Sequence, residues 1–516
     1  MAGEGNSETG MNFLKGAAIL TLAGVGVKVL GGVNRILLSR LLGGEGIGIY
    51  QMAYPVYLIF MAAAGAGLPI AVSILVSGKL AEGDGAGVAK LWLRLAKILA
   101  VAGAGLAMMV FAGARYFVNQ GLISDSRAYL GILALLPAIF FSMILGGWRG
   151  YFQGHQLMRP TALSQVVEQF FRVVTMLLLA YVLLPYGLEY AAAGAAGGAS
   201  VGALCGIFSL YCYREKFKIK NEKLKIKEIS HYVPDLNMKE TLVRLIKLVV
   251  PISLSNLTIP LTAFLDMFLV PQCLLQQGYS QVESTVNFGY LAGMAQPLIL
   301  LSIIPVTSLV FSIIPALTDR PGERQVNINL ALKMTLLITV PAGLGMLALG
   351  GPLAIMLYGA PSAMDAMVHS GPGIFLLGLQ IMTMGILQGL GRVNWPLINL
   401  FLGVVAKIFY VTCYATNIVD CAWATNLNYA VSGGLNLICL LYLGYGLEIF
   451  TWLKIGLTAI FMAVGVHYGQ GYLEAFAGVN FSTLLAVLLG ALMYGIFILK
   501  LRIISFSELK MCGRRR

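Results

Sequence analysis

The sequence predicts an all-α membrane protein with fourteen transmembrane helices, and three observations predict this class. Of the 516 residues, 58% are hydrophobic and 11% are charged, whereas soluble proteins carry about 25% charged residues. The mean hydropathy is +0.83. Segments without any Asp, Glu, Lys or Arg are long enough for the ~20 apolar residues that cross a bilayer, and they cover residues 46–78, 284–318, 334–364, 421–447 and 475–499. This composition excludes a water-soluble globular enzyme.

The apolar segments are continuous instead of alternating at every second residue, which favours helices over the strands of a membrane β-barrel. Inside lipid, a helix satisfies its backbone hydrogen bonds within its own segment. The apolar run that starts at Met11 is as long as the later ones, so we expect no cleaved signal peptide. The expected spans are residues 12–33, 46–76, 91–114, 128–148, 160–184, 190–213, 242–270, 284–314, 330–357, 371–391, 393–417, 421–447, 453–473 and 480–502.

The order of these spans predicts the organisation of the chain. We expect two six-helix bundles related by a pseudo-two-fold axis along the membrane normal, followed by two extra helices. The predicted regions are a polar N-terminal tail (1–11), the first bundle (12–213), a basic cytoplasmic linker (214–241), the second bundle (242–447), helices thirteen and fourteen (448–502) and a basic C-terminal tail (503–516).

Lys and Arg residues are distributed unevenly between the predicted loops. With the N-terminus on the cytoplasmic side, the cytoplasmic loops and both tails hold 27 of them and the outer loops hold 4. Cytoplasmic loops retain positive charge, so we expect a multi-pass plasma-membrane protein with both termini in the cytoplasm. The net charge of +13 then reflects topology instead of nucleic-acid binding. The basic stretch from Arg214 to Lys247 is expected to lie against an anionic leaflet or in solvent.

A short motif occurs twice and indicates an internal repeat. Gly150–Gly154 reads G-x-x-Q-G before span five, and Gly385–Gly389 reads G-x-x-Q-G before span eleven, 235 residues later. Each motif precedes a proline that opens the next span, and each of those spans carries a cation, Arg172 or Lys407. Both loops are assigned to the same side of the membrane, so the repeat is predicted to be parallel.

Charged residues inside spans are costly, about 2.5–3.5 kcal/mol each at the bilayer centre, so each needs a reason. The residues in question are Lys28, Glu168, Arg172, Asp266 and Lys407. Glu168 and Arg172 are spaced i, i+4 and form either a structural pair or part of a site. Lys28 and Lys407 have no acidic residue at i±3 or i±4, which favours a water-filled cavity over snorkelling.

Asp266 has two interpretations, because it lies near the outer end of span seven. It either carries a coupling ion or pairs with Arg35 or Arg40, which are expected to line the outer part of the cavity. The predicted interior is cationic on balance, which suits an anionic substrate, and the planar fork of Arg suits phosphate. The seven cysteines and four histidines have no paired spacing, so no metal site or disulfide framework is predicted.

At several points the chain resembles the stage V sporulation protein B-like group of the multidrug/oligosaccharidyl-lipid/polysaccharide exporter superfamily, which is related to MurJ-type lipid II flippases. The segments that carry the resemblance are Phe13–Gly16, Val29–Gly31, Asn34–Arg35, Arg40–Tyr50, Gly67–Ser73, Gly150–Gly154, Phe264–Asp266 and Pro271. The resemblance implies flipping of a lipid-linked oligosaccharide, with lipid II as the leading substrate. It also implies alternating access through a cationic cavity, and a groove for the polyprenyl tail beside helices thirteen and fourteen.

The resemblance extends to single positions. Lys28 stands where MurJ-type flippases have a basic residue before V-L-G, and the chain reads Asn34-Arg35 where they carry an Arg-Asp pair in the first helix. The predicted substrate-binding residues are therefore Lys28, Asn34, Arg35, Arg40, Arg172 and Lys407, with Glu168 and Asp266 as ion-coupling or charge-pairing residues. No cofactor is expected beyond a coupling Na+ or H+. The expected partners are an anionic lipid-linked glycan, membrane lipids and cell-wall synthesis proteins, but no nucleic acid.

Other function classes remain open on the sequence. A drug or cation antiporter of the same superfamily would need an acidic cavity, for which only Glu168 and Asp266 qualify. A membrane-embedded glycan enzyme would need catalytic acids on a large outer loop, but the predicted outer loops hold single acids only. A proton-pumping subunit of a respiratory complex would usually show more Lys and His in mid-span. We therefore expect a transporter, not an enzyme.

Overall fold

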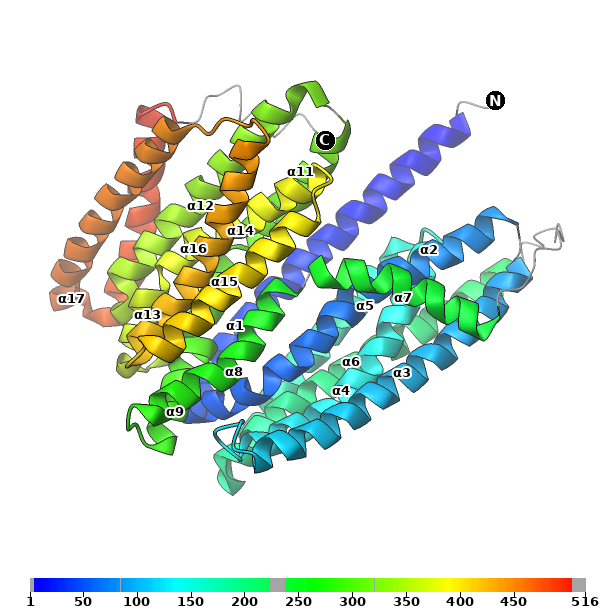
Figure 1. Ribbon diagram of the computed structural model, residues 1–516, viewed down its shortest axis with the longest axis horizontal. Coiled ribbons are helices and arrows are strands. Elements are labelled where there is room, and N and C mark those ends of the chain that lie inside the picture. The colour runs from blue at the N-terminus through cyan, green and yellow to red at the C-terminus, as the bar shows by residue number, and fades with distance from the viewer. Residues whose placement is uncertain (1–3, 84, 223–236, 256, 320, 504–516) are drawn as a thin grey trace. The chain divides into compact units, whose positions relative to one another are not determined.

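The computed structural model describes residues 4–83, 85–222, 237–255, 257–319 and 321–503 (Figure 1). Every regular element in these ranges is a helix, which confirms the predicted all-α class. The chain forms two compact units, Met1–Phe268 and Leu269–Arg516. Residues 223–236 of the predicted linker and 504–516 of the predicted C-terminal tail lie outside the described residues.

The first unit begins with one very long helix. Helix α1 (Glu4–Ala62) runs through residues 34–45, which the sequence places in a loop between spans one and two. Its course changes at Gly43, whose φ of 67° is left-handed and therefore favours glycine. A π-helical turn, η1 (Ala63–Gly67), and the short helix α2 (Leu68–Ala81) follow. Residues 34 and 35 accordingly lie on a helix instead of in a loop.

Helices α4, α5 and α6 pack against α1, and α3, α4 and α7 pack against α2 (Figure 1). Helix α7 ends at Ser255 and α8 begins at Thr258, so the predicted span 242–270 is divided between two helices. The helices are α3 (Gly85–Asn119), α4 (Ala128–Gly154), α5 (Met158–Leu183), α6 (Leu188–Glu222), α7 (Met238–Ser255) and α8 (Thr258–Gln276), the last of which continues into the second unit.

The second unit contains more interrupted helices. Its elements are α9 (Gln281–Phe288), the π-helix η3 (Gly289–Ala295), α10 (Gln296–Ser302), α11 (Ile304–Asp319), α12 (Arg324–Leu353), the π-helix η5 (Ala354–Tyr358), α13 (Met364–Ser370), α14 (Pro372–Gly389), α15 (Asn394–Cys413), α16 (Ile418–Tyr442) and α17 (Ile449–Lys500). A positive φ of 72° at Gly478 kinks α17 between predicted spans thirteen and fourteen.

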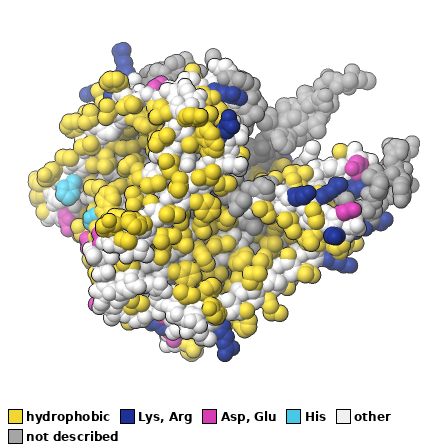
Figure 2. Space-filling view, viewed as in Figure 1, with side chains coloured by type: hydrophobic (Ala, Val, Ile, Leu, Met, Phe, Trp, Pro, Cys, Tyr) yellow, Lys and Arg dark blue, Asp and Glu magenta, His cyan; other side chains and the backbone are white. Residues whose placement is uncertain are grey.

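Ten helices in the described part of the chain are long and apolar enough to cross a membrane, and an eleventh is present if the bent pair Gln281–Ser302 and Ile304–Ile314 is one span. Figure 2 shows hydrophobic side chains over most of the visible face. The protein is therefore a multi-pass membrane protein. The count of fourteen spans and the two-bundle layout stay predictions.

The repeated G-x-x-Q-G motif lies in the last turn of a helix in both units, α4 and α14. A Cβ atom at Gly150 would lie 2.6 Å from Val72 Cβ of α2, and one at Gly385 would lie 2.5 Å from Val310 Cγ1 of α11. No side chain fits at such distances. The motif thus allows a shorter helix to lie against the end of a longer one, at the same place in each unit.

Candidate functional site

A cluster of charged side chains is buried between helices of the first unit. One carboxylate oxygen of Glu168 accepts a hydrogen bond from Arg149 Nη2 at 2.7 Å, and the other accepts one from Arg172 Nη2 at 2.5 Å. The side chains of the three residues are 7–12% exposed. Two guanidinium groups share one carboxylate, so the cluster has an excess of one positive charge away from solvent.

Helix α5 presents this cluster along a single face. Ser164, Glu168, Arg172 and Met176 follow one another at four-residue spacing, which places them on one side of a helix. Arg149, from the end of α4, also donates from Nε to Ser164 Oγ at 3.0 Å. The serine hydroxyl in turn donates to the Thr161 carbonyl oxygen. The carboxylate is therefore held at a fixed place on α5.

Glycines of α6 allow α5 to approach closely at the cluster. A Cβ atom at Gly202 would lie 2.7 Å from the Glu168 carbonyl oxygen and 2.8 Å from Arg172 Cβ. Gly198 and Gly206, one turn to either side, make similar approaches to α5. Small residues at four-residue spacing are typical of close helix packing in membranes. These three glycines of α6 explain why the charged face of α5 is buried against α6.

Three tyrosines of α1 line the other side of Arg172. The Tyr57 hydroxyl accepts a hydrogen bond from Arg172 Nη2 at 2.8 Å and lies 3.3 Å from Ser142 Oγ. The rings of Tyr54 and Tyr57 are 5.7 Å apart, and those of Tyr50 and Tyr54 are stacked at 5.2 Å. Their spacing of four and three residues places them on one face of α1. The Arg172 guanidinium is thus enclosed by aromatic rings and a carboxylate.

Arg35 reaches the same tyrosines from an earlier turn of α1. Its Cζ atom lies 4.7 Å from the centre of the Tyr54 ring, within the distance of a cation–π contact. Arg172 Cζ lies 5.6 Å from the centre of the Tyr57 ring. The two predicted site residues Arg35 and Arg172 are therefore joined through the Tyr54–Tyr57 pair.

Besides Thr161 Oγ1, two polar atoms near the cluster have no hydrogen-bond partner among the described residues. One is Arg172 Nε and the other is Asn34 Oδ1, whose amide nitrogen donates to Met176 Sδ at 2.8 Å. Buried polar atoms are nearly always satisfied, so unpaired atoms next to an excess cation indicate capacity for a further ligand. Asn34, a predicted site residue, contacts the same face of α5 as Arg172.

The remaining predicted residues on α1 are more exposed. Lys28 lies seven residues before Arg35, two helical turns away along α1, and its side chain is exposed. Arg40 is exposed as well. Asp266, on α8, is buried with 6% exposure. Of the predicted residues, the structure thus brings together Glu168, Arg172, Arg35 and Asn34.

Lys407 of the second unit is fully buried on α15. Its Nζ donates to Thr425 Oγ1 of α16 at 2.9 Å, and that hydroxyl donates to the Cys421 carbonyl oxygen. Lys407 follows Arg172 by 235 residues, the offset of the repeated motif. At the position equivalent to Glu168 the second unit has Gly403, which lies against Ser432 of α16. Equivalent cations therefore have different neighbours in the two units.

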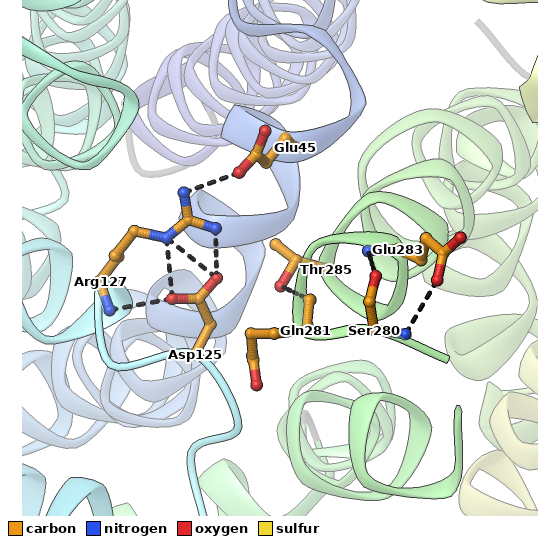
Figure 3. Close-up of polar contacts among 7 residues, drawn as sticks. All are labelled: Glu45, Asp125, Arg127, Ser280, Gln281, Glu283 and Thr285. Carbon is orange, nitrogen blue, oxygen red and sulfur yellow. Dashed lines mark hydrogen bonds and ion pairs between the residues drawn. The ribbon is translucent and has the colours of Figure 1, made fainter. Parts of the chain in front are cut away.

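Each unit also has a polar cluster at a helix start (Figure 3). In the first unit, Arg127 bonds Asp125 at 2.8 Å and Glu45 at 2.7 Å, which ties the start of α4 to the segment after the Gly43 bend. The hydrogen bonds to Asp125 and then to Glu45 raise the pKa of Arg127. In the second unit, Ser280 and Glu283 form a capping box at the start of α9.

Sequence reasoning did not identify Arg149 or the tyrosines as site residues. The predicted span four ends at residue 148, which leaves Arg149 in the following loop, although α4 continues to Gly154. The signal for the tyrosines was their helical spacing in a charge-free segment. No group of three His, Cys, Asp or Glu side chains that could hold a metal ion occurs in the part of the chain that the structure describes.

An apolar groove of about 450 Å³ lies in the second unit between α12 and α17. Its walls include both halves of the kinked α17, represented by Met462 and Tyr494. The other lining residues are mainly Leu, Ala, Gly and Pro side chains from α10, α12 and α14. No charged side chain of the described residues lines the groove, whose walls are mainly apolar.

Comparison with known proteins agrees with this architecture. The chain is 29% identical over 414 residues to stage V sporulation protein B of Bacillus subtilis (strain 168), covering 78% of each chain. It is 28% identical over 419 residues to the lipid II flippase MurJ of the same organism, covering 77% of this chain and 76% of the flippase.

Among solved structures, a lipid II flippase MurJ in an inward closed conformation matches with a TM-score of 0.71 and 16% identity, over 94% of this chain and 99% of that one. An inward-facing multidrug resistance MATE transporter matches with a TM-score of 0.60 and 16% identity, over 80% of this chain and 93% of that one. The fold is therefore that of MurJ and MATE proteins, which are transporters and not enzymes. The polysaccharide biosynthesis protein family matches residues 13–320, which are more than half of this chain. The chain therefore belongs to that family.

Proposed function

We propose that this protein moves an undecaprenyl-pyrophosphate-linked glycan across the plasma membrane, with lipid II as the leading substrate. The observation that carries the proposal is the buried excess of positive charge at Arg149, Glu168 and Arg172. A buried charge excess is costly and is found mainly at functional sites in membranes. A pyrophosphate supplies the missing negative charge and has oxygens that match the fork of an arginine.

In this mechanism Glu168 acts as the resident anion while the site is empty. A pyrophosphate that approaches Arg172 competes with the Glu168 carboxylate, and the unpaired Nε atom gives it a first donor. Arg149 keeps its hold on Glu168 and Ser164, so the carboxylate stays compensated when Arg172 turns to the substrate. Arg35 and Asn34 would bind on the same side, next to the tyrosines.

The glycan and the lipid tail of the substrate need different surroundings. We propose that the glycan occupies a water-filled cavity to which Lys28 and Arg172 of the first unit contribute, with Arg40 toward its outer part. The polyprenyl tail would lie in the apolar groove beside α17. The proposed topology has fourteen transmembrane helices: two six-helix bundles, followed by the two halves of α17. Both termini lie in the cytoplasm. Coupling to Na+ or H+ would use Glu168 or Asp266.

Complementation tests the proposal directly. We expect the wild-type chain to support growth of cells depleted of their own lipid II flippase, and Arg172→Gln to fail although it reaches the membrane in normal amounts. A matched control is Arg115→Gln, which removes an exposed cation of α3 and should complement fully. Full complementation by Arg172→Gln would contradict the cationic-site proposal. Failure of the wild-type chain with lipid II, together with transport of another lipid-linked glycan in proteoliposomes, would change the substrate and keep the site.

A further inference from the structure

Helix α7 (Met238–Ser255) has three distinct faces. Its side chains at 100° per residue fall into a buried arc, an exposed apolar arc and an exposed charged arc. In Figure 1, α7 crosses the long helices of the first unit obliquely instead of running parallel to them. A helix that crosses a bilayer within a bundle runs along its neighbours and has no exposed charged face. Helix α7 differs in both respects.

The buried arc fixes α7 to the unit. Leu245 is 4% exposed and packs in a hydrophobic cluster with residues of α2 and α3, among them Val72 and Leu91. Near the other end of α7, a Cβ atom at Gly67 of η1 would lie 2.2 Å from Ser253 Oγ and 3.2 Å from the Val249 carbonyl oxygen. The backbone of α7 thus lies directly on η1, and its opposite side cannot be covered by the same helices.

The exposed apolar arc lies next to the buried one. It consists of four side chains that are 39–50% exposed: Leu242, Val243, Ile246 and Val250. The charged arc adjoins it and contains Lys247, Glu240 and Arg244, while Lys239 lies within the apolar arc in the first turn of the helix; all four are exposed. Figure 2 shows Lys and Arg side chains on the surface where Figure 1 places α7. Three cations against one acid leave this face positive.

We infer that α7 is an interfacial helix whose cations bind the headgroups of anionic phospholipids. An apolar arc beside a cationic arc is the pattern of a helix that lies in the membrane interface, with its apolar side chains among the acyl chains and its cations at headgroup level. The charge selects anionic over zwitterionic lipid, because each Lys or Arg near an anionic surface is attracted to it. Lys239, Glu240, Val243, Arg244 and Lys247 line one open depression of about 290 Å³, in which three cations outnumber one acid.

Position-specific photo-crosslinking tests this inference on the full-length protein. The photoreactive residue p-benzoylphenylalanine replaces Val243, the protein is placed in nanodiscs of equal parts phosphatidylglycerol and phosphatidylcholine, and the lipid adducts are measured by mass spectrometry. We expect phosphatidylglycerol adducts to exceed phosphatidylcholine adducts on the order of tenfold. The same residue at Leu402, an exposed apolar position of α15, should show no preference.

Charge variants identify the cause of the preference. The triple variant Lys239→Gln, Arg244→Gln and Lys247→Gln should lower the lipid ratio at position 243 to that at position 402, while the total adduct yield stays the same. The matched control is Lys90→Gln, Lys97→Gln and Lys454→Gln, which removes three exposed cations elsewhere and should keep the preference. An unchanged ratio in the triple variant of α7 would overturn the inference.

Two further outcomes would also overturn it. If position 243 forms no lipid adducts, α7 does not lie in the interface. If inorganic pyrophosphate displaces phosphatidylglycerol adducts while sulfate at the same ionic strength does not, the face binds a soluble or substrate phosphate instead of a leaflet. Persistence of the phosphatidylglycerol preference under pyrophosphate supports the lipid surface.

Discussion

Arg149 and Arg172 bind opposite oxygens of one carboxylate, that of Glu168. The arginines come from different helices, so the carboxylate joins α4 to α5 as well as neutralising one of the two charges. Because both guanidinium groups depend on it, Glu168 is the residue whose loss should affect the first unit most.

Glu168→Gln should destabilise the protein by about 3 kcal/mol or more, because it leaves two buried guanidinium groups without a counter-charge. Thermal unfolding in detergent measures the loss. The double variant Arg149→Gln/Glu168→Gln removes one cation together with the anion. Its loss of stability should therefore be smaller than the sum of the losses in the two single variants. A Glu168→Gln protein as stable as wild type would show that the carboxylate is not shared as described.

Arg172→Lys should retain insertion and most of the stability but lose most of the transport. An ammonium keeps the charge but has no planar fork with which to bond a phosphate in two directions. Transport of a fluorescent lipid-linked oligosaccharide in proteoliposomes is the measurement, with Arg115→Lys as control. Equal transport by Arg172→Lys and wild type would mean that charge alone matters at this position.

Tyr57→Phe removes the hydroxyl that accepts from Arg172 at 2.8 Å. Hydrogen bonds to charged groups contribute about 1.5–3 kcal/mol, so we expect a destabilisation of about 1.5 kcal/mol and weaker substrate binding. Tyr181→Phe, on an exposed part of α5, serves as the control and should behave as wild type. No difference between the two variants in thermal unfolding would count against a role for the hydroxyl.

Gly202→Ala should destabilise the protein by about 1–3 kcal/mol, because the new methyl group would lie within 3 Å of both Glu168 and Arg172. Gly197→Ala on the same helix meets no atom within 4 Å and should be neutral or slightly stabilising. Thermal unfolding of the two proteins compares them directly. Similar midpoints would indicate that α5 and α6 can separate at the cluster without cost.

The predicted topology can be tested by cysteine labelling in intact cells, in a chain without its native cysteines. Ser230→Cys lies in the predicted cytoplasmic linker and should react with an impermeant maleimide only after the membrane is opened. Gln120→Cys, between α3 and α4, is predicted outside and should react at once. Labelling of Ser230→Cys from outside intact cells would reverse the orientation.

The sequence by itself determined the class of this protein. Long apolar stretches without charge predict membrane helices whatever their packing, because lipid offers a backbone no other partner. The i, i+4 spacing of Glu168 and Arg172 likewise predicts their contact, since that spacing is local to one helix. The 235-residue repeat identifies Gly150 and Gly385 as related positions, although not the reason why each is a glycine.

Only the tertiary structure decided which residues complete the site. Arg149 lies in the last turns of α4 and Tyr57 lies in a segment without charge, so no local spacing connects either of them to Glu168 and Arg172. They meet because Gly202 lets α5 sit deep against α6 and because α1 continues as a helix past its bend at Gly43. Contacts between helices depend on packing at distances that sequence periodicity does not encode, whereas contacts within a helix follow from 3.6 residues per turn.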